Sequence, residues 1–286
     1  MNRLDLKRRV QIIAALVEGV GIRATCRMVG CTKGAVTKLI ADLGPACMEY
    51  HDAAVRGIHS ERVQCDELWS FVLAKQKNLR PELRGQRGVG SVWTWTGLDS
   101  DSKLMISYHV GNRGLDDARL FMSDLAGRLA GRVQLSTDSH SAYLGAVAES
   151  FPYFGGAGVN YGQLVKVYGS SGNDNSAETR YSPGRLIRAE KRSVLGNPDE
   201  AHISTSHAER MNLSIRMGLR RYTRLTNAHS KKIQNHVAAL AIFFQFYNFA
   251  RVHQSLRITP AMKAGIADHV WEIEEIVGLL ERAEAA

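Results

Sequence analysis

The stretch HISTSHAERMNLSIRMGLRRYTR, residues 202–224, places one acid, Glu209, ahead of a run of arginines. Ser206 and Glu209 have the S-x-x-E spacing of a capping box, and apolar residues follow at helical intervals, so we expect Ser206 to be the N-cap of a helix that starts there. On that helix Glu209, Asn212 and Arg216 share one face, because they lie three and four positions apart. Such a face can bind a metal ion at one end and phosphates along the rest. Glu209 can equally well do no more than complete the capping box.

Length and composition indicate a globular protein. The chain has 286 residues and is 44% hydrophobic, enough to bury a sizeable core in one large domain or two smaller ones. It contains no run of about 18 apolar residues, and the stretch MNRLDLKRRV lacks the apolar segment of a signal peptide. We therefore expect a soluble, cytoplasmic protein that makes no membrane contact.

The net charge of +9 is unevenly spread along the chain. Residues 180–232 contain twelve Lys or Arg against four Asp or Glu, whereas residues 261–286 contain two against six. A basic block favours a polyanionic partner such as nucleic acid, although a solvated surface produces the same pattern.

Residues 1–44 predict three short helices. Apolar residues recur at helical spacing over 4–18, a second helix is expected over 22–29, and Gly30 supplies a tight turn before a third helix at 32–43. This is the outline of a helix-turn-helix, whose third helix enters the major groove with its N-terminal residues. A plain three-helix bundle would show the same pattern. We predict a DNA-binding domain in which the following residues face bases and phosphates: Thr32, Lys33, Thr37 and Lys38.

After a linker helix predicted at 45–61, apolar residues begin to alternate. The segment RVQCDELWSFV, residues 62–72, predicts a strand that contains Asp66 or ends at it. Acids are depleted in strands, and one in a half-buried strand requires a partner or a metal. A basic loop follows at 75–87. Two further strands at 91–99 and 103–111 complete an antiparallel meander, and the chain then continues into a helix at 115–129.

A second acid, Asp138, closes the strand predicted at 132–138 and precedes a helix at about 140–149. Ligands of α/β proteins bind at this edge of a sheet, although Asp138 can also serve simply as a helix cap. A further strand is expected within 159–168. Residues 169–201 are rich in Gly, Ser, Asn and charged residues, and predict a long inserted loop.

The order of these elements is that of a ribonuclease H-like fold. In that plan the first strand, the fourth strand and a late helix bring three acids together, and the acids at those positions here are Asp66, Asp138 and Glu209. The expected fold class is therefore α/β. A ribonuclease H-like mixed sheet with flanking helices spans 62–253, follows the all-α helix-turn-helix domain and precedes a C-terminal helical tail at 254–286.

Three blocks resemble the IS1-type insertion-sequence transposases, which are enzymes of the DDE class. They are QCDELWSFV at 64–72, LSTDSHSAY at 135–143 and HISTSHAERMNLSIRMGLRRYTRLTNAHSKK at 202–232. The segment YNFARVHQSLRITPAMKAG, residues 247–265, is similar to the closing part of many DDE transposases.

The resemblance implies an enzyme of DNA transposition that cleaves DNA strands and joins them to a target. It implies Asp66, Asp138 and Glu209 as catalytic residues and as ligands of two Mg²⁺ or Mn²⁺ ions. In two-metal sites the ions lie roughly 3.5–4 Å apart and stabilise the attacking and leaving oxygens, and we expect Asp66 to bridge them. The implied setting is the prokaryotic cytoplasm, with the enzyme associated with the nucleoid when it acts. The implied partners are the element's terminal repeats, target DNA and further copies of the chain, in a homodimer or larger assembly.

Polar and basic residues at and beyond the Glu209 helix fit phosphate contacts, which are independent of sequence. Two other functions remain open: a ribonuclease H-fold nuclease or resolvase that cuts without joining, and a DNA-binding regulator without catalysis. The residues predicted to contact DNA here are Asn212, Arg216, Arg220, Arg221, Arg224, Lys231 and Lys232.

Overall fold

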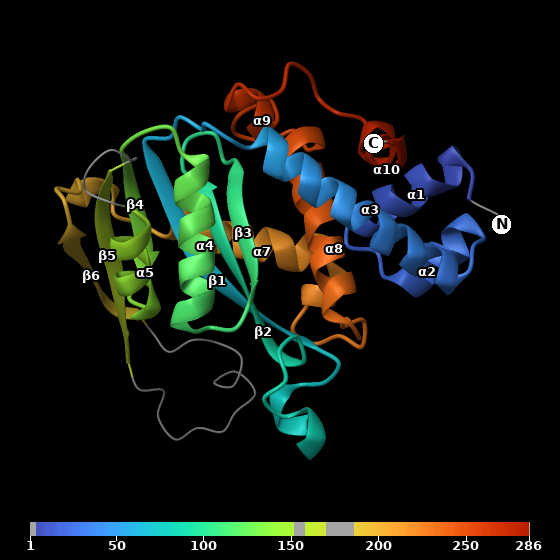
Figure 1. Cartoon of the computed structure of the whole chain (residues 1–286), viewed down its shortest axis with the longest axis horizontal. Coiled ribbons are helices and arrows are strands. Elements are labelled where there is room, and N and C mark those ends of the chain that lie inside the picture. The colour runs from blue at the N-terminus through green and yellow to red at the C-terminus, as the bar shows by residue number, and fades with distance from the viewer. Residues whose placement is uncertain (1–3, 152–157, 170–185, 286) are drawn as a thin grey trace.

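A computed structural model describes residues 4–151, 158–169 and 186–285 (Figure 1). The strands are β1 (Arg62–Val72), β2 (Gly90–Asp99), β3 (Met105–Gly111), β4 (Val133–Asp138), β5 (Val159–Tyr168) and β6 (Leu186–Leu195). The α-helices are α1 (Leu6–Val17), α2 (Ile22–Val29), α3 (Lys33–Ala54), α4 (Leu115–Arg128), α5 (Ala142–Ser150), α7 (Ser206–Gly218), α8 (Ile233–Gln245), α9 (Pro260–Lys263) and α10 (Ile273–Ala285). Short 3₁₀ turns are η1 (Gln76–Asn78), η2 (Pro81–Leu83), η3 (Glu200–His202) and η4 (Arg220–Tyr222), and α8 continues into a π-helical turn, η5 (Phe246–Ala250).

The six strands form one mixed sheet in the order β3-β2-β1-β4-β5-β6. Strands β1, β2 and β3 are the predicted antiparallel meander. Strand β4 joins β1 in parallel, β5 joins β4 in parallel, and β6 closes the far edge antiparallel to β5. The predicted α/β class, a mixed sheet with flanking helices, is confirmed, and this architecture is compatible with a ribonuclease H-like fold.

Strands β1 and β4 stay paired only at their beginnings. Their register ends with Gln64 opposite Ser136, whereas β1 remains paired with β2 as far as Val72. Asp66 and Asp138 each lie two residues beyond the last β1–β4 pair, so they stand level with each other where the strands part. The carboxyl ends of two parallel strands therefore form a fork, the position at which α/β sheets bind ligands.

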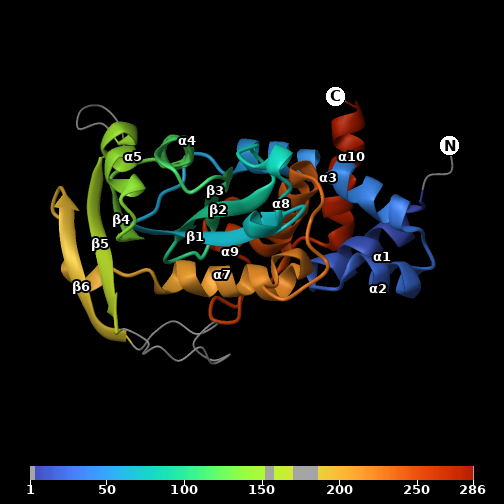
Figure 2. The same ribbon diagram turned by 90° about the horizontal axis from the view of Figure 1, so that it is seen from below.

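Helices cover both faces of the sheet. Figure 2 shows α4 and α5 on one face and α7 on the other. On the α4 and α5 side, Trp95 of β2 packs against Phe121 and Tyr143 in a fully buried aromatic layer. On the α7 side, Gln64 Oε1 accepts hydrogen bonds from the backbone N–H groups of His207 and Ala208. These bonds fix where α7 begins relative to β1.

Helix α8 is largely buried, and its sequence is correspondingly apolar. Phe243 and Phe244 are fully buried and belong to the core. The side chain of Asn248, in the π-helical turn, bonds both the N–H and the C=O of Met105, which satisfies part of the edge strand β3. Within the described ranges no helix is both long enough and apolar enough to cross a membrane.

The third helix is longer than its sequence predicted. We expected it to end at Leu43, and this is wrong: α3 runs through Pro45 to Ala54, so the predicted linker helix is its second half. Proline costs a helix one backbone hydrogen bond. The buried face of α3 against α8 outweighs that loss, because Gly44 lets the two backbones approach closely at Ala238.

The C-terminal segment docks on the N-terminal helices. Trp271 lies 4.9 Å from both Tyr50 and Phe249, measured between ring centroids. Helix α10 packs against α1 and α3, and Arg9 Nη2 donates to Glu281 Oε1 at 2.9 Å. The two ends of the chain therefore share one layer beside the sheet (Figure 1).

The inserted loop predicted at 169–201 is partly wrong. Its second half forms β6, which pairs with β5 from Tyr168 back to Tyr161. The side chains of β6 are mostly exposed, so its sequence lacks the apolar alternation that marks a half-buried strand. Residues 170–185 lie outside the described residues.

The close approach of α3 and α8 can be tested by a pair of Gly to Ala variants in one helix. A Cβ on Gly44 would lie 2.3 Å from Ala238 Cβ, so we expect Gly44→Ala to lower the free energy of unfolding, by about 1–3 kcal/mol for overpacking. The control is Gly34→Ala, where the nearest atom would be 3.8 Å away, and helix propensity predicts a gain of up to about 1 kcal/mol. Urea denaturation measures both, and equal effects would contradict the packing argument.

Candidate metal centre at the fork of β1 and β4

Three carboxylates meet at the fork. Asp66 and Glu67 come from β1 and Asp138 ends β4, and one oxygen of each lies within 4.8 Å of the others. Two of the three predicted acids, Asp66 and Asp138, are therefore together. They meet because the fork leaves β1 unpaired on its β4 side beyond Gln64.

Glu67 was not predicted to take part. Its side chain is only 1% exposed, and its neighbours hold both of its oxygens. Arg113 Nε donates to Glu67 Oε1 at 2.8 Å, and the hydroxyl of Tyr143 donates to Glu67 Oε2 at 3.1 Å. Residues 66 and 67 face opposite sides of an ordinary strand, so alternation predicts that their carboxylates part. At the open edge of the fork both reach the same space.

The arrangement concentrates negative charge in a partly buried place. Burial and the Glu67 carboxylate raise the pKa of Asp66 to about 7. Burial and the Asp138 carboxylate raise the pKa of Glu67, against the opposing effect of the Arg113 guanidinium. Desolvation and like charges both favour the protonated acid. One guanidinium does not neutralise three carboxylates, so the cluster has the charge to bind a cation.

Helix α7 reaches the cluster through Asn212. Its Nδ2 donates to Asp66 Oδ2 at 2.7 Å, while Asp66 Oδ1 accepts the backbone N–H of Glu67 at 2.9 Å. This contact places the polar face predicted for α7, with Glu209 one turn earlier on the same face, beside the fork.

Glu209 itself lies outside the group of three carboxylates. Its side chain is 45% exposed and forms an ion pair with Lys166 of β5. Thr205 Oγ1 also donates to Glu209 Oε1, at 2.6 Å. Its negative charge still contributes to the raised pKa of Asp66, so it lies within electrostatic reach.

The predicted capping box is wrong. Helix α7 begins at Ser206, so Thr205 is the N-cap, and it makes no side-chain hydrogen bond to the helix backbone. Glu209 is thus the fourth helical residue, and its carboxylate is not engaged with an N-terminal backbone N–H. The capping box therefore does not explain Glu209, whose carboxylate instead contacts Lys166 and Thr205.

The cluster suits a hard divalent cation. Mg²⁺ and Mn²⁺ prefer oxygen ligands, and Asp66, Glu67 and Asp138 offer only oxygens. Two buried polar atoms beside the carboxylates, Asn212 Oδ1 and His140 Nε2, have no hydrogen-bond partner within the described protein. Buried polar atoms are normally satisfied, so both fit a site whose remaining contacts come from an ion and its bound water.

The basic residues beyond Glu209 divide into two groups. Arg216 donates to the carbonyls of Tyr222 and Trp69, and Arg221 donates to the carbonyl of Asn235. Burial lowers the pKa of each guanidinium to about 10. Both guanidiniums thus stabilise the fold through backbone carbonyls. A phosphate contact by either arginine stays a prediction. The exposed group consists of Arg220, Arg224, Lys231 and Lys232.

The residues predicted to enter DNA stand at the start of α3. Thr32 is the N-cap, and its Oγ1 accepts the backbone N–H of Ala35 at 3.2 Å. Lys33 is exposed, Thr37 Oγ1 donates back to the Lys33 carbonyl, and Lys38 pairs with Asp42. Three helices joined by a tight turn are present as predicted, and their use in DNA binding stays a prediction.

No protein-family model matches this chain, and no curated protein matches it either. The geometry of the acidic cluster therefore carries the functional argument.

Replacing Asp66 by Asn should show how far the ionised Asp66 carboxylate destabilises the fold when metal is withheld. The folded-state pKa of about 7 lies above the ordinary aspartate value of 3.8. Between about pH 4 and pH 7 the folded protein therefore holds a proton that the unfolded chain has released, so stability falls as the pH rises through this range. Asn cannot ionise. With chelator at pH 8 we expect Asp66→Asn to be more stable than wild type, by on the order of 2–4 kcal/mol.

This gain should shrink as the pH is lowered towards about 4, and saturating Mg²⁺ should raise the Tm of the wild type more than that of the variant. The matched control is Asp116→Asn, at an acid whose side chain is 88% exposed and outside the cluster. Thermal unfolding in the same buffers measures both variants. Parallel pH profiles for wild type and Asp66→Asn would show that the cluster is not under electrostatic strain.

Proposed function

We propose that the chain is a DDE transposase, which binds the ends of an insertion sequence, cleaves a DNA strand and transfers it to target DNA with Mg²⁺ or Mn²⁺. One observation carries the proposal: Asp66 and Asp138 adjoin at the fork of two parallel strands, beneath a helix that carries Glu209. Three acids from these elements are the plan expected of the ribonuclease H-like fold.

The residues divide the work as follows. Asp66, Asp138 and, on its approach, Glu209 would hold the metal, with Glu67 as a further oxygen donor. When bound, such ions polarise a phosphodiester and stabilise the attacking and leaving oxygens. Arg113 holds Glu67 through Nε, and its Nη2 lies 3.9 Å from Asp138 Oδ2. Its charge keeps two acids close together before any cation arrives.

Glu209 lies on the helix that already contacts the cluster. Asn212, one turn further along α7, already contacts Asp66, so the backbone of the helix is in place. To bind the metal, the Glu209 side chain would have to leave Lys166 and Thr205 for another staggered rotamer. Because half of its surface is open to solvent, this exchange disturbs no core contact.

DNA binding would use two exposed basic regions. The first is the start of α3, as the helix-turn-helix that we propose for the element's terminal repeats. The second is the exposed group beyond Glu209, which suits sequence-independent phosphate contacts. Because two DNA ends must be joined to one target, we propose that the active form is a homodimer or a larger assembly.

Alanine at each acid tests the proposal. We expect Asp66→Ala, Asp138→Ala and Glu209→Ala to lose cleavage and strand transfer to background, because each removes a metal ligand, while binding of end DNA persists. Cleavage of a labelled element end and its joining to a supercoiled plasmid, each with Mg²⁺ and with chelator, measure the two steps.

Asp116→Ala, at an exposed acid away from the fork, is the control and should keep both activities. Cleavage without any joined product in the wild type would identify a hydrolytic nuclease. Unchanged activity in Asp66→Ala would overturn the proposed site.

A further inference from the structure

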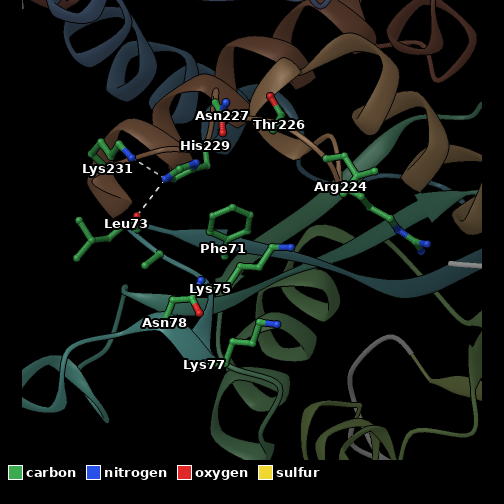
Figure 3. A pocket seen from close by; sticks show the side chains of 12 residues that line it. Phe71, Leu73, Lys75, Lys77, Asn78, Arg224, Thr226, Asn227, His229 and Lys231 are labelled. Atoms are coloured by element: carbon green, nitrogen blue, oxygen red, sulfur yellow. Dashed lines mark hydrogen bonds between the residues drawn. The ribbon is translucent and has the colours of Figure 1, made fainter. Parts of the chain in front are cut away.

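A second site lies beyond the carboxyl end of β1. A pocket of about 780 Å³ is bounded by residues 71–78, where β1 runs into the basic loop, and by residues 224–231, between η4 and α8 (Figure 3). We call it the β1-end pocket. The two segments are fixed to each other, because Val72 bridges to Ser230 and the backbone N–H of Leu73 donates to the Ser230 carbonyl at 2.8 Å. The pocket is therefore a built feature of the fold.

The lining of the β1-end pocket is cationic. Its twelve residues include four Lys or Arg and no Asp or Glu. In Figure 3 the side chains of Lys75 and Lys77 extend in the same direction, across the pocket from Arg224. Between the cations stand neutral hydrogen-bonding side chains. The polar lining consists of Lys75, Lys77, Arg224, Lys231, His229, Asn78, Thr226 and Asn227.

The hydrogen bonds of His229 are not all satisfied within this lining. Its Nε2 lies 3.0 Å from the Leu73 carbonyl and 2.6 Å from Lys231 Nζ. One ring nitrogen cannot donate to the carbonyl and accept from the ammonium at the same time. The buried Nδ1 of His229 has no hydrogen-bond partner within the described protein. The polar groups at this wall are therefore not all satisfied by the protein, and an anionic ligand beside Lys231 would relieve the conflict.

Two aromatic rings underlie the cations of the pocket. The rings of Phe71 and His229 lie 4.7 Å apart between centroids, and Lys75 Nζ sits 6.0 Å from the Phe71 centroid. Phe71 is only 7% exposed, so this ring pair supports the cations and offers little surface on which a base could stack.

The pocket and the acidic cluster lie along the same strand. Five residues separate Asp66 from Phe71, which at about 3.3 Å per residue is about 17 Å. Helix α7 runs beside this stretch, with Asn212 on Asp66 and Arg216 on the Trp69 carbonyl. One phosphate per strand recurs about every 3.4 Å of duplex, so on a duplex that runs parallel to β1 the pocket would lie about five base pairs from the cluster.

We propose that the β1-end pocket binds phosphates of the DNA that the acidic cluster cuts, about five base pairs from the cut and without reading sequence. The identity of the ligand as DNA rests on the proposed function, whereas the preference for phosphate rests on the pocket itself. A free nucleoside triphosphate is the other source of such phosphates. The lining contains no glycine with which a loop would wrap a triphosphate, so DNA is the better fit.

Salt-dependent DNA binding tests the proposal. Fluorescence anisotropy with a labelled duplex of the element end, in chelator so that nothing is cut, gives the binding constant over a range of salt. Each lost phosphate contact reduces the slope of log K against log salt by about 0.9. We expect Lys75→Ala/Lys77→Ala to reduce the slope by about two and to weaken binding at low salt. The control Lys263→Ala/Arg282→Ala removes the same charge near the C-terminus and should leave the slope unchanged.

A crosslink tests the position of the DNA. Leu225 lines the pocket and is 66% exposed, so a photoreactive benzoylphenylalanine there leaves the core intact. We expect it to crosslink to duplex about five base pairs from the cleaved bond, and ATP in excess should not prevent this. Displacement of the duplex by ATP would assign the pocket to free nucleotides and overturn the proposal.

The outcomes distinguish failure of the pocket proposal from failure of the proposed function. If wild type cleaves and joins DNA while the Lys75/Lys77 variant keeps the control's slope, the pocket proposal fails and the transposase proposal stands. If wild type binds DNA with the expected slopes but the alanine variants at the acids lose nothing, the proposed function fails and the pocket remains a DNA site. If the wild type does not bind DNA, both the pocket proposal and the proposed function fail.

Discussion

The short pairing between β1 and β4 is the constraint on which the rest of the structure depends. If the two parallel strands stayed together, backbone hydrogen bonds would fill the edge where Asp66 and Asp138 now stand. Because the strands part beyond Gln64, three carboxylates approach within 4.8 Å of one another, and their negative charges repel. The molecule accommodates this with Arg113, with the Tyr143 hydroxyl and with an amide from α7. The fork thus determines which residues on the surrounding helices must be polar.

The sequence predicted the structure best in segments whose apolar residues follow a single strand or helix period. Alternation over β1 and its two successors predicted the meander, and an acid at the end of β4 pointed to the sheet edge. The acid at 209 drew attention to α7, although the cap is Thr205 and not Ser206. Local patterns therefore located two of the clustered carboxylates and the helix beside them, because strand and helix periods are properties of neighbouring residues.

What the sequence could not supply came from contacts between distant segments. Glu67 joins the cluster only because the fork opens a strand edge, and alternation alone sends its side chain to the other face. Pro45 looked like a helix end, but burial of α3 against α8 carries the helix past it. Strand β6 has an exposed, charged sequence and exists through backbone pairing with β5. In each case tertiary context overrode a sound local rule.

The unbroken course of α3 has a consequence for where a bound duplex would be cut. The helix has 22 residues, a rod of about 33 Å, with Lys33 at one end and, near the other, His51, whose Nε2–H donates to the Ile106 carbonyl of β3 at 3.0 Å. If α3 reads DNA as we propose, one continuous helix connects the recognition end to the sheet that carries the acids. The spacing from recognised base pairs to the severed bond then becomes a property of helix length. Each residue inserted into α3 would lengthen this spacing by about 1.5 Å. It would also rotate the recognition end of the helix by about 100° about the helix axis.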